Sequence, residues 1–223
     1  MRHDYNRIAA GDVGRIAALS DGVFAFAATV LVLDIRTPER ADIHTEAELL
    51  AALWAQAPHL LSWLLSLMTL GIFWVGQQTQ LNNLKRADRD FTWLSLLFLA
   101  VVAALPFSTR LLADFFHFRT AFLIYWANIL LCGVTIYATW SNAICNKLVR
   151  DDLPPETERA IRTRIVVAQS LYALGAAIGF AHSLAGVVFI IAVQLNYAIA
   201  PIWQWRRRSS LLSTSTGGED DKE

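Results

Sequence analysis

Charged residues are scarce in this chain. Only 17% of the 223 residues are Asp, Glu, Lys or Arg, whereas soluble domains usually carry about 25%. The 19 acidic and 19 basic residues balance, so net charge gives no reason to expect nucleic acid as a partner. The shortage comes from long apolar runs, because 55% of the residues are hydrophobic. A soluble domain is therefore not the expected class.

Cysteine and histidine are also few. If the stretch between Cys132 and Cys145 is helical, the two lie about 20 Å apart along its axis, too far for a disulfide, and they lack metal-ligand spacing. We interpret them as buried small hydrophobes. The five histidines lie mostly in or near connections and share no motif: His3, His44, His59, His117 and His182. The sequence therefore predicts no metal, no other cofactor and no enzyme.

Six apolar segments approach the length of about 20 residues that a helix needs to cross a bilayer. They are Ile16 to Ile35, Leu49 to Gly76, Phe91 to Leu112, Ala121 to Ile144, Ile165 to Ala181, and Leu184 to Trp205. The fifth is short and could begin earlier, near Ile161. The first is too long for a signal core, so we expect it to stay as an anchor. We predict an all-α integral membrane protein with six transmembrane helices over residues 1–208 and a disordered polar tail, 209–223.

Lysine and arginine predict the orientation. If both termini and the second and fourth connections share one side, that side holds 15 of the 19 basic residues; the other holds only Arg36, Arg40, Arg110 and Arg119. Both termini should therefore be cytoplasmic. Tryptophans near segment ends suit the membrane interface: Trp54, Trp93, Trp203 and Trp205.

The first segment contains two acidic residues, and a charge inside a membrane is a functional hypothesis by default. Asp34 is near the segment end and can reach the interface. Asp21 lies deeper. It is either an ion or proton site or a buried carboxylate hydrogen-bonded to neighbouring helices, and we favour the second interpretation. In a helix that turns about 100° per residue, six residues of this segment fall on one stripe, and Asp21 lies off it. Its members are Leu19, Gly22, Phe26, Thr29, Val30 and Leu33. Such a stripe usually faces lipid or packs, and Thr29 usually bonds within its own helix.

The first segment resembles the first helix of the prokaryotic transmembrane protein 175 family. The signature there is Arg, three residues, then Phe-Ser-Asp and an apolar run with a threonine, matched by Arg15, Ser20, Asp21 and Thr29. A second block also agrees: Gly71 to Trp74, Asn83-Leu84, Asp88, Trp93 to Leu99, and Leu105 to Thr109. The resemblance covers the first three segments, and the rest agrees in hydropathy alone.

This resemblance implies a potassium-permeable channel in the plasma membrane of a prokaryote, without the usual Thr-Val-Gly-Tyr-Gly filter, a motif this chain lacks. It implies a homotetramer in the lipid bilayer, with the first helices around a central pore and potassium as the permeant ion. The implied constriction is Phe26, Val30 and Leu33, with Thr29 as a polar ring. The implied structural network is Arg15, Ser20, Asp21, Trp74 and Gln77. A small rotation or splay of the first helices would let water into the constriction. The preference for potassium over sodium should be modest.

Three positions depart from the family pattern: Leu19 stands for phenylalanine, Phe26 for the usual isoleucine, and Gln77-Gln78 for His-His. Glutamine cannot titrate, so pH sensitivity through that site is not expected. One alternative is a secondary ion transporter using a buried Asp21, although such proteins usually show internal repeats, absent here. Another is a membrane enzyme or a non-conducting structural protein, for which the histidines and acidic residues show no cluster.

Overall fold

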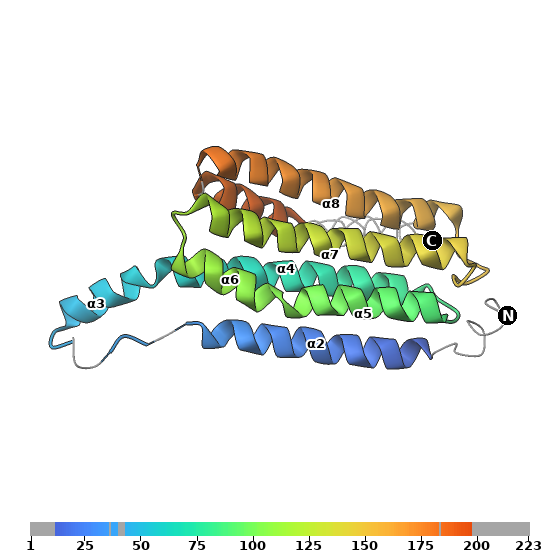
Figure 1. Ribbon diagram of the computed structural model, residues 1–223, viewed down its shortest axis with the longest axis horizontal. Coiled ribbons are helices and arrows are strands. Elements are labelled where there is room, and N and C mark those ends of the chain that lie inside the picture. The colour runs from blue at the N-terminus through green and yellow to red at the C-terminus, as the bar shows by residue number, and fades with distance from the viewer. Residues whose placement is uncertain (1–11, 36, 40–42, 183, 198–223) are drawn as a thin grey trace, which may run out of the picture.

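The computed structural model describes residues 12–35, 37–39, 43–182 and 184–197. Within these ranges the regular structure is helical, with one isolated β-bridge (Figure 1). The helices are α2 (Val13–Leu33), α3 (Glu46–Ala55), α4 (Ala57–Asn82), α5 (Arg89–Ala103), α6 (Leu105–Asp114), α7 (Arg119–Cys145), α8 (Pro155–Ala181), and one further helix, Leu184–Tyr197. The all-α prediction is confirmed.

Five segments are long and apolar enough to cross a membrane. They are Val13–Leu33, Ala57–Asn82, Arg89–Asp114, Arg119–Cys145 and Pro155–Ala181. The helix Leu184–Tyr197 is apolar but shorter, and the rest of the predicted sixth segment, like the tail 209–223, lies outside the described residues. The count of six therefore stays a prediction.

The predicted second segment, Leu49 to Gly76, has the wrong bounds. Residues 46–55 form a separate helix, α3, which begins with a capping box between Thr45 and Glu48. The membrane candidate α4 begins at Ala57, and Pro58 fits its first turn because a proline there has no helical N–H to lose. At its other end α4 continues past Gly76 to Asn82.

Two other predicted segments differ in detail. The third is two helices, α5 and α6, which meet at Ala104 just before Pro106. The fifth begins at Pro155, before both Ile165 and Ile161, with Glu156 and Glu158 in its first turn. Carboxylates there stabilise a helix N-terminus. Apolar composition marks the part of a helix that suits lipid, and the helix itself extends beyond it.

The helices form a bundle with α2 along one side (Figure 1). Helix α2 packs against α4, α5 and α6, while α7 packs against α5, α6 and α8. The larger core lies between these helices and includes Phe24, Leu65, Phe98 and Tyr125. Cys132 is buried and Cys145 is exposed at the end of α7; both are free, so only Cys132 fits the predicted buried role.

Helix α8 and the 184–197 helix meet through glycines. A Cβ added to Gly186 would lie 2.5 Å from the Cα of Gly179, and a Cβ added to Gly175 would lie 2.7 Å from Ile190 Cγ1. No real Cβ fits so close to a backbone atom. The pair therefore approaches backbone to backbone, as small residues allow in membrane helix packing.

Two connections are tied together at one end of the bundle. The Lys85 N–H donates to the Leu148 carbonyl at 2.9 Å, and the Arg150 N–H donates to the Asn83 carbonyl at 3.0 Å. These bonds flank an antiparallel bridge between Leu84 and Val149. The α4–α5 and α7–α8 connections therefore lie on the same side, as the distribution of basic residues predicts.

Candidate functional site: the exposed face of α2

Helix α2 turns one face toward its own chain. Asp12 caps its start, where the carboxylate accepts from the Gly14 N–H at 2.8 Å. The buried residues recur every three or four positions, the spacing of one helical face. They are Ile16, Ser20, Phe24, Ala27 and Leu31. Packing in the subunit thus fixes the rotation of α2 about its axis.

The predicted stripe lies mainly on the opposite face. Phe26 is 70% exposed and Leu33 is 76% exposed, and Leu19, Gly22 and Thr29 are exposed as well. Val30 is half-buried, because it lies about 40° around the helix from Phe26, toward the buried Ala27. The face that a pore would require is therefore left uncovered by this chain, with Val30 at its edge.

Thr29 is the polar residue of that face. Its hydroxyl donates to the Phe26 carbonyl at 2.7 Å, the internal bond that threonine usually makes in a helix. The hydroxyl proton is thus committed to the backbone. The oxygen still has a free lone pair, so Thr29 can offer an acceptor, but not a donor, to a cation on this face.

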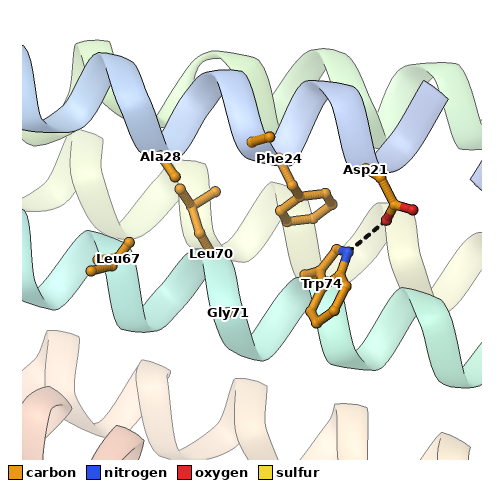
Figure 2. A pocket seen from close by; sticks show the side chains of 8 residues that line it. Asp21, Phe24, Ala28, Leu67, Leu70, Gly71 and Trp74 are labelled. Carbon is orange, nitrogen blue, oxygen red and sulfur yellow. Dashed lines mark hydrogen bonds between the residues drawn. The ribbon is translucent and has the colours of Figure 1, made fainter. Parts of the chain in front are cut away.

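Side chains of α2 and α4 are joined by polar contacts near the start of α2. The Ser20 hydroxyl donates to Gln77 Oε1 in the buried layer. One carboxylate oxygen of Asp21 accepts from Trp74 Nε1 at 2.8 Å and from Gln78 Nε2 at 2.7 Å. Figure 2 shows the Trp74 indole pointing from α4 toward that carboxylate. Four of the five predicted network residues are therefore brought together.

Three details differ from the prediction. Asp21 is bonded but exposed in this chain, so the description of it as buried was wrong for the single subunit. The Arg15 side chain has no hydrogen bond or ion pair with the described part of the chain; its backbone N–H donates to the Asp12 carbonyl at 3.1 Å. Gln78 was missed as a partner of Asp21, although it lies one turn from Trp74 and thus on the same face of α4.

An apolar groove of about 310 Å³ runs between α2 and α4 beside this network. Ala25 and Ala28 of α2 line it together with Leu67, Leu70 and Gly71 of α4. Asp21 and Trp74 lie at one end (Figure 2). The groove is open to the outside of the subunit, and Phe24 adds an aromatic ring to its lining. Apart from Asp21 the lining is apolar or aromatic, which suits contact with another apolar surface.

The other end of α2 is linked to α6 by ion pairs. Arg110 Nη1 lies 3.7 Å from Asp34 Oδ1, and its Nε lies 3.6 Å from Asp114 Oδ2. Asp114 also lies 3.8 Å from His59 Nε2 of α4. Asp34, at the end of its segment, is therefore paired with Arg110 of the same chain. Such a pair suits a carboxylate at the membrane interface.

A second polar cluster lies inside the bundle and was not predicted. Ser66 of α4 bonds Thr109 of α6 at 2.6 Å, and Gln194 Nε2 donates to Thr69 at 2.6 Å. The Tyr125 hydroxyl lies 3.2 Å from Ser66 and 3.3 Å from Thr69. All five side chains are uncharged, so the cluster joins four helices without a buried charge. Within the described ranges, no three His, Cys, Asp or Glu residues are grouped to bind a metal.

Comparison with known proteins finds a matching family model and a similar solved structure. The family model described as the endosomal/lysosomal potassium channel TMEM175 matches residues 15–106, which run from the first turn of α2 to the start of α6. A crystal structure of a lysosomal potassium-selective channel TMEM175 homolog from Chamaesiphon minutus superposes with a TM-score of 0.74 at 27% identity, covering 84% of this chain and 97% of that one. Over residues 15–106 the chain is therefore similar to the TMEM175 family. The matched family and the superposed structure are described as channels, which agrees with the prediction that the chain is not an enzyme.

Two curated relatives from bacteria are similar to about half or to most of this chain. A potassium channel from Streptomyces collinus is 43% identical over 102 residues, 46% of this chain and 48% of that protein. A potassium channel from Chamaesiphon minutus is 29% identical over 188 residues, 82% of this chain and 92% of that protein. The chain thus matches about half the length of the first relative and most of the second. The family model ends in α6, where the predicted resemblance also ends.

Proposed function

We propose that the chain is one subunit of a potassium-permeable cation channel whose pore is lined by α2. The observation that carries the proposal is the exposed face of α2. Phe26 and Leu33 are exposed on this face, while the opposite face packs against the rest of the subunit. The bacterial relatives named potassium channels support it. A pore-lining helix must keep one face free of its own subunit, and α2 meets that requirement.

One α2 cannot enclose a pore, so the proposal needs further copies around a central axis. We propose a homotetramer, in which the groove between α2 and α4 receives apolar side chains of a neighbouring subunit. The small residues Ala25, Ala28 and Gly71 in its lining support this, since membrane helices associate through close packing of small residues. The Asp21–Trp74 contact at the groove end would then be shielded from lipid by the neighbour.

The proposed gate is hydrophobic. Four copies each of Phe26, Val30 and Leu33 form a narrow apolar neck, and water leaves such a neck when it is closed. The four Thr29 oxygens provide an acceptor ring beside it. With no cage of carbonyl groups in this neck, the preference for potassium over sodium should be modest. Outward splay of the α2 helices widens the neck and wets it.

The finer topology belongs to the same proposal. The chain contributes six transmembrane helices, with both termini in the cytoplasm, to the plasma membrane of a prokaryote. The five candidate spans and the apolar helix Leu184–Tyr197 support the count. The tied α4–α5 and α7–α8 connections support the grouping of basic residues on one side. Potassium is the permeant ion, and no resident cofactor is needed.

The test is ion flux from liposomes loaded with potassium or sodium, without valinomycin. Val30→Ala and Leu33→Asn should raise basal potassium flux because they widen or wet the neck. Val32→Ala is the matched control, since Val32 is exposed on α2 but lies about 100° from Leu33 around the helix. Folding and oligomeric state of every variant are checked by size-exclusion chromatography in detergent.

Unchanged flux in both neck variants, with the folded tetramer intact, would exclude this pore. Asp21 supplies the test of the transporter alternative. Potassium movement that requires a proton gradient and disappears in Asp21→Asn would favour a secondary transporter. Passive potassium movement that exceeds sodium movement without such a gradient supports the channel.

A further inference from the structure

Helix α8 changes from polar to apolar at Arg164. Its first three turns carry Arg159, Arg162 and Arg164, and the residues that follow, from Ile165 to Val167, are aliphatic. Val166 and Val167 are exposed on the outside of the bundle. If α8 crosses the membrane, this change of composition sets the level of the lipid headgroups. The arginines then lie where lipid phosphates lie.

A groove of about 540 Å³ runs between this part of α8 and the 184–197 helix. Ala160 and Thr163 form part of its floor, Arg159 and Arg164 flank them, and Tyr197 lines it from the other helix. Arg164 lies over the Tyr197 ring, with its guanidinium carbon 5.8 Å from the ring centre. Val167 lines the apolar end.

The two flanking arginines have no acidic partner among the residues that the structure describes. Within the described residues, neither Arg159 nor Arg164 lies within ion-pair distance of a carboxylate. The arginines nearby are different, because Arg162 pairs with Glu158 at 3.9 Å and Arg150 with Asp152 at 3.0 Å. Glu156 is the acidic residue of the groove lining, so two guanidinium groups face one carboxylate. The groove is therefore net positive.

We propose that this groove binds the phosphate of an anionic phospholipid, with one acyl chain lying over Val167. Guanidinium groups match phosphate oxygens with paired hydrogen bonds, and the Thr163 hydroxyl can add a third donor. Basic pockets between membrane helices bind anionic headgroups in this way. The inference rests on the proposed membrane topology and does not depend on ion conduction.

Native mass spectrometry of the intact protein in detergent tests the site, with phosphatidylglycerol and phosphatidylcholine as probes. Phosphatidylglycerol should bind more tightly to the unaltered protein. Arg159→Gln and Arg164→Gln should each weaken its binding about fivefold, and the double variant about thirtyfold. Arg162→Gln is the matched control, because that arginine already has Glu158 as a partner; its binding should stay within about twofold of the unaltered protein.

Two results would overturn the proposal. One is equal binding of the two lipids, or an unchanged preference in the double variant when its melting temperature shows that it is folded. The other is displacement of phosphatidylglycerol by millimolar inorganic phosphate, which would identify a general anion site in place of a lipid site. Because the readout is bound lipid, it is independent of flux: a protein that binds the lipid but conducts nothing supports this site and contradicts the channel.

Discussion

The indole nitrogen of Trp74 lies 2.8 Å from the same Asp21 carboxylate oxygen that Gln78 Nε2 approaches at 2.7 Å. Both donors come from α4, one turn apart, and the acceptor comes from α2. A carboxylate with two such donors is fixed in direction. The contact therefore sets the position of α2 along α4. It also gives the Asp21 carboxylate two hydrogen-bond donors.

Trp74→Phe removes the indole donor and keeps an aromatic ring. We expect this variant to lower the free energy of unfolding by about 1 kcal/mol, since one hydrogen bond to a charged group is lost while Gln78 remains. Thermal unfolding in detergent, followed by circular dichroism, measures the change. Trp126→Phe is the matched control, because Trp126 Nε1 is buried and has no hydrogen-bond partner among the described residues. An equal loss in both variants would mean that ring volume, and not the bond to Asp21, is responsible.

Thr29→Val removes the one hydroxyl from the exposed face of α2 with little change of shape. In the proposed tetramer this deletes the acceptor ring, so potassium over sodium selectivity should fall by about threefold, the effect of one weak polar contact in a membrane. Reversal potentials in planar bilayers measure it. Thr79→Val is the control, because Thr79 makes the same type of internal bond, to the Val75 carbonyl at 2.8 Å, on α4. Unaltered selectivity in Thr29→Val would remove the hydroxyl from the mechanism.

Gly186→Ala forces α8 and the 184–197 helix apart, because the new Cβ would meet the Gly179 backbone. We expect a loss of about 1–3 kcal/mol in unfolding free energy, the usual range for overpacking. Gly76→Ala offers the comparison, since its Cβ would make an ordinary contact at 3.5 Å with Ile136 and alanine favours a helix. Chemical unfolding in mixed micelles compares the two. Equal stability of both variants would contradict the close approach.

Glu48 gives α3 a pH dependence. The backbone N–H groups of His44 and Thr45 donate to its carboxylate and lower the pKa of Glu48 below its ordinary value. A lowered folded pKa means that the stabilisation is complete above the ordinary glutamate pKa of about 4.3 and is lost as pH falls through the folded value. The α3 capping box should therefore open in acid.

Carbon NMR of the labelled Glu48 carboxyl, titrated in detergent, measures that pKa directly. Glu48→Gln is the matched variant, because glutamine can still cap the helix but does not titrate. The Thr45 amide shift should change less with pH in this variant than in the unaltered protein, because the Glu48 carboxylate is gone whereas Glu46, also in the first turn of α3, is present in both. A Glu48 pKa at or above the ordinary value would contradict the capping geometry.

The membrane class and most of the spans could be predicted from apolar length alone, because no other structure needs such runs. The helix bounds could not, since apolar runs do not mark where a helix begins. Thr45 and Glu48 carry a capping signal for the start of α3, Pro58 marks the start of α4, and Pro106 marks the break after α5. These signals are present in the sequence, but a reading by hydropathy passes over them. At Pro155 the helix extends past the apolar segment because exposed polar residues complete it in water.

The partners of Asp21 show a different limit. Spacing indicates that Trp74 and Gln78 share a face of α4, but not which way that face is turned. The rotation of α4 follows from packing over its whole length, including the Ser66 and Thr69 cluster with Tyr125. Those contacts join residues more than 50 positions apart, and no local pattern specifies them. Arg15 shows the converse, since its place in a motif does not give its side chain a hydrogen bond or an ion pair within the described residues.

The two attachments of α2 limit how a gate on it can move. Asp21 holds the helix to α4, and Asp34 holds it to α6 through Arg110. The attachment points are about 20 Å apart along the axis. Helix α2, attached at two such points, cannot rotate about its own axis without breaking one of the two contacts. In the proposed channel, Phe26, Val30 and Leu33 would therefore move together with the rest of the subunit, and the proposed outward splay of α2 would be a tilt of whole subunits.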